Sequence, residues 1–471
     1  MIMKKWLSGI LALFSGTLFL AAAEKPNVIY IMADDLGIGD VGCYGQKILK
    51  TPRIDQLAEE GIRFTEHYSG AALCAPTRSC LLTGTHLGHT TVRNNGDFSL
   101  KIEDVTFGEL MKSVGYKTAA IGKWGVGEID STGRPNKQGF DLFFGYLNQR
   151  NAHFHYPPFM WRNEEKEFYP DNREKRTHFS HDLFTEEALK FVRDNKDGPF
   201  CLYVPYTLVH ADIDVPDDSL KPWVGNIEET EPYGTPDGQH YIHQKTPHAA
   251  FAGMVSRLDR DVGKIADLVD ELGIAENTLI IFTSDNGPTP AGGADPEFFD
   301  GNGLYRGIKF SLYDGGIRCP MIARWPGTIE AGSESKHLSA HWDVLPTMAE
   351  VAGAKVPEGV DGVSFLPELK GEAEKQKAHD YLYWEWPSKS GWQAVRQGNW
   401  KAHWTGTRSG LRNATFELYD LSKDIAEENN VAAKFPEVAA KMKKLMDEAH
   451  IPEHDGADPL FTRASSKKKK K

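Results

Sequence analysis

Short apolar segments of strand length alternate with segments of helical periodicity along most of this chain, and this alternation constrains its fold more than any other feature. Apolar runs stand at 27–32, 116–122, 199–205 and 278–283. In the segment 251–272, apolar residues recur at helical spacing until Gly273 ends the pattern. Strands that are apolar at nearly every position are typical of sheets buried on both faces. The sequence therefore predicts an α/β fold, a large and mainly parallel sheet flanked by helices.

Two weaker helix signals and one long irregular stretch complete the first part of the chain. Thr51 can cap a short helix in which Pro52 takes the first position and Gly61 marks the end. Helical periodicity also covers 107–111. The stretch 124–180, rich in Gly, Pro, Asn and aromatic residues, predicts an ordered insertion without regular structure that faces a substrate.

The pattern changes near residue 375, which indicates a second, smaller unit. We predict a catalytic α/β domain over 24–374 and a C-terminal subdomain over 375–455, an antiparallel sheet plus a helix. Its expected strands are 382–386, 393–396, 400–404 and 417–420, followed by a helix at 437–448. The tail 456–471 ends in five lysines and is expected to be disordered.

The first 23 residues have the organisation of a secretory signal peptide. Lys4 and Lys5 precede a short apolar stretch, and three alanines precede Glu24. A membrane anchor is the alternative, but the stretch is short for a bilayer span, so we expect no stable membrane insertion. The sequence predicts an exported protein, periplasmic or secreted.

Charge and cysteine content narrow the class further. The formal net charge is −12, which argues against nucleic acid as a partner and requires any anion site to be a local basic pocket. Five cysteines are an odd number for an exported protein, so at least one is unpaired or modified, unless the chain has no disulfides at all.

Acidic pairs follow two of the predicted strands directly. Asp34 and Asp35 follow the first strand, and Asp285 and Asn286 follow the strand at 278–283. The carboxyl ends of parallel strands form the edge where open α/β proteins bind ligands. Carboxylate and amide oxygens suit Ca²⁺ or Mg²⁺ better than zinc. Solvated loops or helix caps are the alternative for either pair alone.

The segment 73–84 carries the strongest motif, Cys-x-Pro-x-Arg followed by Leu-Leu-Thr-Gly. Pro76 suits the first turn of a helix, so Cys74 is expected at a helix N-terminus, where the dipole favours an anion. Arg78, about one turn on, can reach back towards it. A small buried thiol at a helix start is the alternative.

Taken together, the motifs resemble those of the type I, formylglycine-dependent sulfatases of the alkaline phosphatase superfamily, from residue 24 to about 450. The resemblance rests on their order along the chain: Asp34-Asp35, Cys74-Ala75-Pro76-Thr77-Arg78, Gly122-Lys123-Trp124, His210, Asp285-Asn286-Gly287, Lys309, and 314–320. It implies that a maturation enzyme oxidises Cys74 to formylglycine (3-oxoalanine), whose hydrate is the nucleophile towards a sulfate ester.

The resemblance also implies a role for each of these residues. Asp34, Asp35, Asp285 and Asn286 would hold the cation, Ca²⁺ or Mg²⁺, together with the modified residue 74. Arg78 and Lys123 would stabilise the charged nucleophile. Lys309 and His210 would bind the sulfate and the bridging oxygen, with His210 a candidate general acid.

One position departs from the family pattern. Many sulfatases have His two residues after the lysine of the Lys-Trp motif, where this chain has Gly125. His153 and His155 are the candidates to replace it or to bind substrate, and ordinary loop histidines are the alternative. Arg93 is a further candidate for substrate binding, or part of a surface turn. The aromatic residues of 153–161 and 384–392 favour a sulfated carbohydrate as substrate.

Two other functions stay open on the sequence. A phosphoester or phosphonate hydrolase of the same superfamily would share the sheet and the acidic site, although such phosphatases usually need histidine ligands. A degenerate, non-catalytic glycan-binding homologue is the other alternative, supported by Gly125 and the aromatic residues.

Overall fold

The computed structural model describes residues 25–96, 98–236, 241–387, 391–406 and 414–452. The predicted signal peptide and the lysine-rich tail lie outside these residues. In the described part of the chain, no helix is both long and apolar enough to cross a membrane.

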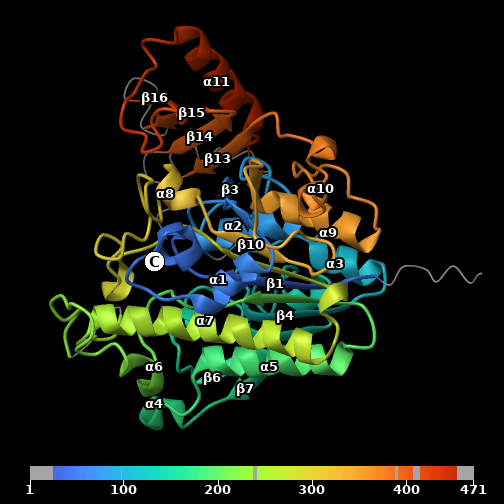
Figure 1. The fold of residues 1–471 in the computed structure, drawn as a ribbon, viewed down its shortest axis with the longest axis vertical. Helices are drawn as coiled ribbons and strands as arrows, with labels where there is room; N and C mark the ends of the chain where they lie inside the picture. The colour runs from blue at the N-terminus through green and yellow to red at the C-terminus, as the bar shows by residue number, and fades with distance from the viewer. Residues whose placement is uncertain (1–24, 97, 237–240, 388–390, 407–413, 453–471) are drawn as a thin grey trace, which may run out of the picture.

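The central layer is a sheet of ten strands within the described residues, in the order β11-β2-β10-β9-β1-β8-β4-β5-β6-β7 (Figure 1). Its middle strands β9, β1, β8, β4 and β5 run parallel, whereas β10 and β6 are antiparallel to β9 and β5. The predicted α/β fold with a mainly parallel sheet is confirmed. The strands are β1 Asn27–Ala33, β2 Ile62–Phe64, β4 Lys117–Lys123, β5 Leu142–Tyr146, β6 Phe159–Arg162, β7 Glu165–Phe168, β8 Phe200–Pro205, β9 Thr278–Ser284, β10 Met321–Arg324 and β11 Ser333–Ser335.

Helices cover both faces of this sheet, which explains why its strands are apolar at nearly every position. Ile29 and Ile31 of β1 share a core with α1, α5 and α7, and Val28 and Tyr30 share another with α2, α3 and α9. The long helix α7 starts at Pro247, earlier than the apolar pattern indicates. The helices are α1 Pro52–Glu59, α2 Cys74–Thr83, α3 Phe107–Ser113, α5 Ser180–Asn195, α7 Pro247–Glu271 and α9 Val344–Ala352, with the short α4 Asn172–Lys175, α6 Asp217–Leu220, α8 Asp314–Ile317 and α10 Leu366–Leu369.

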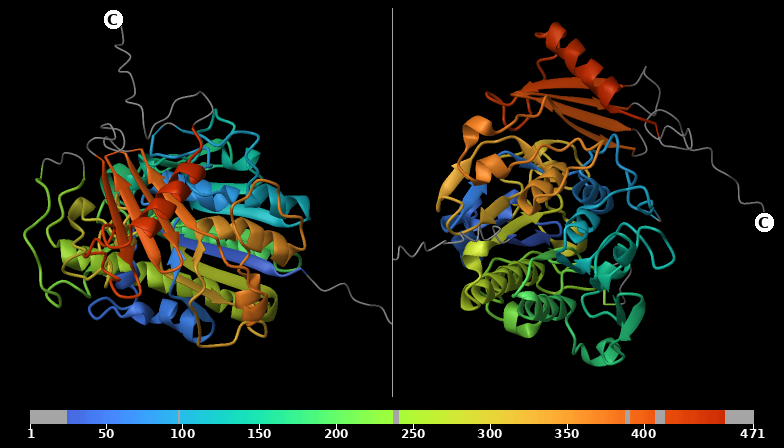
Figure 2. Two further views of the ribbon diagram at one scale, coloured as in Figure 1. Left: turned by 90° about the horizontal axis from the view of Figure 1, so that it is seen from above. Right: turned by 90° about the vertical axis from the view of Figure 1, so that its right-hand side faces the viewer.

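The C-terminal part forms a separate antiparallel sheet with one helix on it, as predicted. The strands pair in the order β13-β14-β15-β16, and Figure 2 shows this unit lying against one side of the larger body. Trp384 anchors it there, because its indole N–H donates to the Ser69 carbonyl at 2.9 Å. The elements are β13 Leu382–Trp386, β14 Trp392–Gln397, β15 Trp400–Thr405, β16 Thr415–Asp420 and α11 Pro436–Ala449; β3 His67–Tyr68 and β12 Ser339–Ala340 form a further small pair.

Two local predictions were wrong. The stretch 124–180 is not irregular, because β5, β6 and β7 lie within it and extend the main sheet; these strands are short and aromatic, and the Gly and Pro residues between them hide their pattern. Thr51 does not cap α1 with its side chain. Its hydroxyl instead accepts the Gly42 N–H at 2.7 Å.

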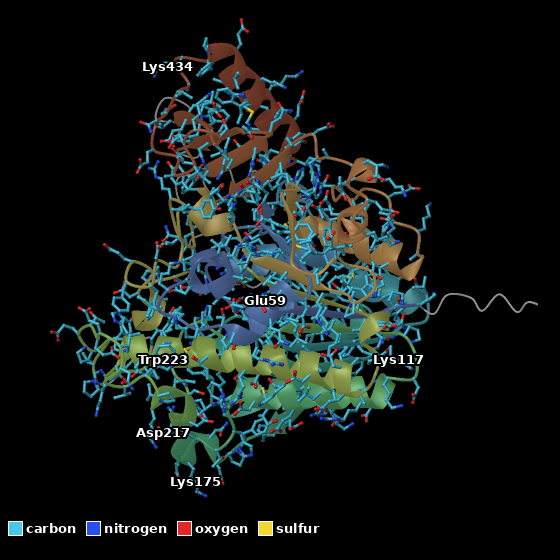
Figure 3. All side chains as sticks on the ribbon, viewed as in Figure 1. Glu59, Lys117, Lys175, Asp217, Trp223 and Lys434 are labelled. Carbon is cyan, nitrogen blue, oxygen red and sulfur yellow. The ribbon has the colours of Figure 1, made fainter. Side chains whose placement is uncertain are left out.

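Charged side chains lie mostly on the outside, as Lys175 and Lys434 show at opposite ends of the molecule (Figure 3). All five cysteines are free, and Cys74 is among the buried ones. The odd cysteine count therefore reflects a chain without disulfides. One group of fully buried charges lies at the carboxyl end of β1 and includes Asp34, Arg78, Lys123 and Asp285.

Candidate active site

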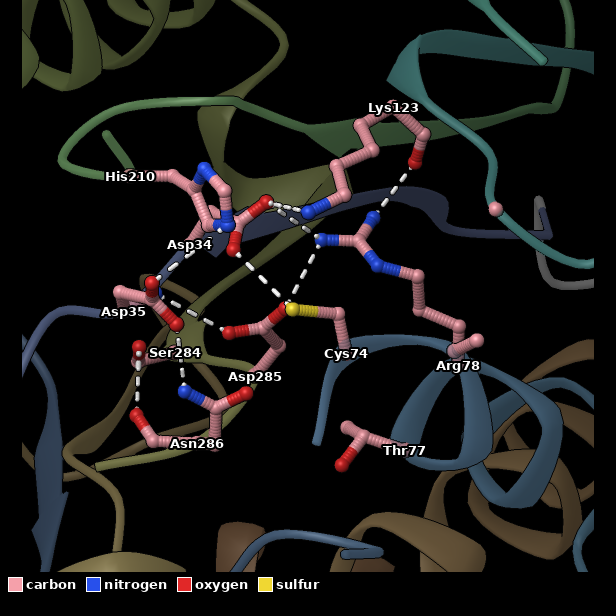
Figure 4. A network of polar contacts seen from close by, with 12 residues as sticks. Asp34, Asp35, Cys74, Thr77, Arg78, Lys123, His210, Ser284, Asp285 and Asn286 are labelled. Atoms are coloured by element: carbon pink, nitrogen blue, oxygen red, sulfur yellow. Dashed lines mark hydrogen bonds and ion pairs between the residues drawn. The ribbon is translucent and has the colours of Figure 1, made fainter. Parts of the chain in front are cut away.

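The two acidic pairs meet at the carboxyl edge of the sheet. Ala33 of β1 is in parallel register with Ser284 of β9, so the residues that follow each strand are neighbours. The Asp35 N–H donates to Asp285 Oδ1 at 3.1 Å, and the Asn286 amide donates to Asp35 Oδ1 at 2.7 Å (Figure 4). Asp35 has a positive φ of 64°, a conformation that Asp tolerates better than most residues.

Cys74 is the first residue of α2, and its thiol faces these acids. Its Sγ lies 3.6 Å from Asp34 Oδ1 and 3.3 Å from Lys309 Nζ. Burial raises the pKa of the Cys74 thiol to about 12, although Lys123 and Lys309 oppose the shift. The unmodified thiol is therefore protonated at neutral pH and is a poor nucleophile.

The start of α2 is held in place by two side chains. Thr77 Oγ1 donates to the Ala71 carbonyl and accepts the Ala71 N–H, both at 2.9 Å. Asn95 Oδ1 accepts the Ala75 N–H at 3.0 Å and so satisfies one of the free amides of the first turn. Helix and loop thus fix the position of Cys74.

Arg78 and Lys123 balance the acids from within the core. The Arg78 guanidinium contacts Asp285 Oδ2 at 3.0 Å and Asp34 Oδ2 at 3.3 Å, and it also donates to the Lys123 carbonyl. The Lys123 ammonium lies 2.5 Å from Asp34 Oδ2. All four side chains are fully buried, so each charge depends on its partners for stabilisation.

Lys309 and His210 both lie close to the Asp35 carboxylate. Lys309 Nζ is 2.6 Å from Asp35 Oδ1, and His210 Nε2 is 3.6 Å from Asp35 Oδ2. His210 Nδ1 lies 2.6 Å from the Ala211 carbonyl, which requires the proton on Nδ1 in the neutral ring. Burial and then the Lys123 charge lower the pKa of His210 well below its ordinary value.

Three carboxylates in so small a volume repel one another. Burial, followed by the charge of Asp34, raises the pKa of Asp285 to about 6. Burial also raises the pKa of Asp35, although Lys309 opposes it. For Asp34, burial is outweighed by Lys123, His210 and Arg78, which hold its pKa below the usual range. A divalent cation at this edge would relieve the repulsion.

The donor set fits a hard divalent cation. Asp34, Asp35, Cys74 and His210 each offer an atom within 4.8 Å of the others. The side-chain oxygen of Asn286 is buried without a hydrogen-bond partner, which is unusual for a buried amide and is explained if it ligates a cation. Carboxylates with one amide oxygen are the ligands of Ca²⁺ and Mg²⁺.

The remaining predicted residues lie at different distances from this centre. The ring of His153 is 4.5 Å from that of His210, and burial followed by the Lys123 charge lowers its pKa to about 4. The buried ring of His155 instead holds the carbonyls of His210 and Asp212, at 3.0 and 2.9 Å. His155 therefore contacts the backbone of the segment that carries His210.

Arg93 lies between the two parts of the molecule. It contacts Glu385 of β13 at 3.2 Å and donates to the Ile451 carbonyl at 2.6 Å. These partners give Arg93 a role in holding the C-terminal sheet to the loop after α2.

The side chain of Gln149 occupies the space next to Gly125 where a larger residue would lie, and the sequence alone did not indicate this contact. Gly125 has a φ of +81°, and a Cβ built there would lie 2.2 Å from Gln149 Nε2 and 3.4 Å from Arg78 Cδ. A histidine here would carry the strain of a positive φ and would require the flexible amide end of Gln149 to move. No short-range signal links residues 125 and 149, so only the folded chain shows their contact.

An acidic sheet edge that faces a helix N-terminus and is lined by basic side chains is the arrangement implied by the resemblance to the sulfatases of the alkaline phosphatase superfamily. The sulfatase family model matches residues 26–354, and a second one, described as N-sulphoglucosamine sulphohydrolase, C-terminal, matches 303–451. The chain belongs to the sulfatase family and is a sulfuric ester hydrolase.

Named relatives agree with this assignment. Human arylsulfatase A is 32% identical, over 93% of this chain and 89% of its own. The N-acetylgalactosamine-6-O-sulfatase of Bacteroides thetaiotaomicron is 28% identical, over 90% of this chain and 93% of its own. A crystal structure of Ps i-CgsB in complex with k-i-k-neocarrahexaose has a TM-score of 0.77 at 27% identity, covering 94% of this chain and 96% of that chain.

Proposed function

We propose that this protein is an exported sulfatase that removes sulfate from sulfated carbohydrates, using a formylglycine made from Cys74 and a divalent cation, Ca²⁺ or Mg²⁺. The observation that carries the proposal is the position of the Cys74 side chain. Cys74 is the first residue of α2, and its Sγ lies close to both the Asp34 carboxylate and the Lys309 ammonium. An oxygen nucleophile at this position would contact both the proposed cation site and a cationic side chain.

Two features of residue 74 support its modification. As a thiol it is protonated at neutral pH, because burial raises its pKa to about 12. The hydrated aldehyde supplies a hydroxyl nucleophile at the same position, and a separate maturation enzyme is needed to make it. Since Cys80, a second buried thiol of α2, lies outside the motif, it is a matched control for Cys74.

Asp34, Asp35, Asp285 and Asn286 would hold the cation. When bound, it would act as a Lewis acid towards a sulfate oxygen and would lower the pKa of a hydroxyl at residue 74. Arg78 and Lys123 keep the carboxylates ionised by direct contact. They also bring positive charge close to the oxygen of residue 74, which favours its deprotonated form.

Lys309 and His210 are suited to the sulfate and the leaving group. The Lys309 ammonium, 3.3 Å from Sγ, can donate to a sulfate oxygen held over residue 74. His210 Nε2 can donate to the departing alcohol only as the imidazolium, since Nδ1 carries the proton in the neutral ring. A bound sulfate would favour this form through its negative charge.

His153 is the candidate for proton removal in place of the histidine missing at residue 125. Its ring lies 4.5 Å from His210. Its Nδ1 is 2.9 Å from the Ala211 carbonyl, which assigns the proton to Nδ1 and leaves Nε2 basic. A pKa of about 4 keeps the ring neutral, as a proton acceptor must be. His155 and Arg93 are proposed to support the substrate site through the segments they hold.

The names of two relatives support carbohydrate as the substrate class. One acts on N-acetylgalactosamine 6-O-sulfate by its name, and one structure holds a neocarrahexaose. We also propose residues 24–374 as the catalytic domain and 375–455 as a subdomain that borders the substrate. Export by residues 1–23 would place the enzyme where sulfated polysaccharides occur.

The experiment is a desulfation assay of the protein coexpressed with a formylglycine-generating enzyme. The substrates are sulfated galactose, N-acetylgalactosamine, glucosamine and fucose, neocarra-oligosaccharides, and matched 4-nitrophenyl sulfate and phosphate. We expect sulfate release from at least one sugar, loss of it in Cys74→Ala, and its retention in Cys80→Ala. Faster cleavage of the phosphate ester would favour the phosphoester hydrolase. Full conversion of residue 74 without any hydrolysis would favour the glycan-binding homologue.

A further inference from the structure

Phe310 combines two properties that stability alone does not explain. Its φ is +69°, a left-handed conformation that is a genuine outlier for a bulky side chain. Its side chain is 47% exposed, so burial returns only part of the cost of this backbone. Strained conformations of this kind cluster at active sites and ligand-binding segments, where the surrounding structure holds them.

The position of Phe310 relates it to the active site. It follows Lys309, whose ammonium lies 5.7 Å from the centre of the Phe310 ring and 3.3 Å from Cys74 Sγ. The Phe310 N–H donates to the Ala72 carbonyl at 3.0 Å, and the Lys309 N–H to the Pro288 carbonyl at 2.9 Å. These bonds fix the backbone that carries both side chains, and the partly exposed Phe310 ring lies next to the Lys309 ammonium.

Trp386 of β13 stacks against this ring. The two ring centres are 5.8 Å apart, with an angle of 29° between the planes. Trp384, two residues earlier on the same face of the strand, is fully buried, which anchors β13 and fixes the direction of Trp386. Trp386 itself is partly exposed. We call Phe310 and Trp386 the aromatic platform.

We propose that the aromatic platform packs against one face of the sugar ring next to the reacting sulfate. Sugar rings have apolar C–H faces and polar edges, which suits a flat aromatic surface beside a charged site. A sugar ring can turn polar edges towards the charged side chains beside the platform, whereas an aryl or steryl group has no such edges. The inference rests on the proposed function, because it assumes a carbohydrate substrate.

The substitution Phe310→Asn isolates the ring from the backbone. Asn tolerates the left-handed conformation, so this variant should fold and should melt no lower than the wild type. We expect kcat/KM to fall at least tenfold, mainly through KM, on whichever sulfated sugar the wild type cleaves. Phe310→Tyr, which keeps a ring, should recover most of it, and Trp386→Ala should lower it several-fold.

Two controls separate substrate packing from damage to the sulfate site. Inhibition by inorganic sulfate should change less than twofold in Phe310→Asn, because the anion does not reach the platform. Phe168→Asn removes another exposed phenylalanine, 67% exposed on β7, and should leave kcat/KM unchanged.

The outcomes distinguish this inference from the proposed function. If the wild type cleaves a sugar sulfate and both platform variants stay within twofold of it, the platform is overturned and the carbohydrate proposal stands. If the wild type cleaves 4-nitrophenyl sulfate and no sugar sulfate, both are overturned. A lower melting temperature with weaker inorganic sulfate inhibition in Phe310→Asn would assign the residue a structural role and overturn the platform.

Discussion

Replacing Lys401 with methionine tests how the C-terminal sheet is joined to the catalytic body. Lys401 of β15 is fully buried, with its ammonium 2.5 Å from Asp314 Oδ1 and 3.1 Å from Glu427 Oε1. The side-chain carboxylate of Glu427 also accepts the Asp314 N–H at 2.7 Å. Methionine keeps the length and volume of the chain but leaves two buried carboxylates without their shared cation.

The expected cost follows from this geometry. Removing one partner of a buried ion pair costs about 3–5 kcal/mol, because the remaining charge stays buried. Arg318, 3.7 Å from Asp314 Oδ2, still compensates part of the charge, so we expect a loss of about 3 kcal/mol. Asp314 is also close in sequence to Lys309, so kcat/KM on sulfate esters should fall as the Lys309 segment loosens.

Urea unfolding followed by circular dichroism measures the loss, and Lys423→Met is the matched control. Lys423 also pairs with a carboxylate, Asp420 at 2.6 Å, but its side chain is 78% exposed. Exposed pairs contribute little, so this control should stay within about 0.5 kcal/mol of the wild type. A loss below about 1 kcal/mol in Lys401→Met would refute the reasoning that the buried pair holds the two parts together.

The pH dependence gives a second check on the same pair. Burial would raise the pKa of Asp314, but Lys401 and Arg318 outweigh it and hold the pKa below its usual range. The contribution of the Lys401–Asp314 pair to the free energy of unfolding is therefore present above the pKa of aspartate in the unfolded chain, about 4. It is lost as the pH falls below that value. The difference in free energy of unfolding between wild type and Lys401→Met should hold from pH 7 to about pH 5 and narrow as the pH falls below about 4. A constant difference would contradict this assignment.

Three further predictions concern the active site. Gly125→Ala should lower the free energy of unfolding by about 1–3 kcal/mol through backbone strain and the contact with Gln149. Adding Gln149→Ala to this variant should restore only part of the loss. An unchanged melting temperature of Gly125→Ala would contradict the steric argument. Asn286→Leu should weaken Ca²⁺ binding about tenfold or more in calorimetric titration, and unchanged affinity would remove Asn286 from the ligand set. Dialysis against a chelator should abolish activity and added Ca²⁺ or Mg²⁺ should restore it; full activity after chelation would exclude a required cation.

The fold and the centre of the site could be predicted because both depend on local signals. Apolar strands identify the sheet, and the residues directly after β1 and β9 meet because parallel strands end at one edge. Cys74 could be placed at a helix start because Pro76 allows it. Each of these inferences needs only the residues next to the motif.

Residues defined by distant contacts could not be predicted. Arg93 next to Asn94 and Asn95 suits a ligand contact, yet its carboxylate partner, Glu385, is far along the chain. His155 and His153 have the same residue type and nearly the same position, and only the fold separates the buried ring from the one beside His210. The conformation of Phe310 has no sequence signature.

The central claim is that residue 74 acts only after conversion to formylglycine. Preparations made with graded amounts of the maturation enzyme should be analysed by mass spectrometry of the peptide containing Cys74 and by sulfate release from the same samples. The account predicts that turnover is proportional to the converted fraction, with a line through the origin, since the buried thiol is protonated. Equal turnover in unconverted and fully converted enzyme would contradict it.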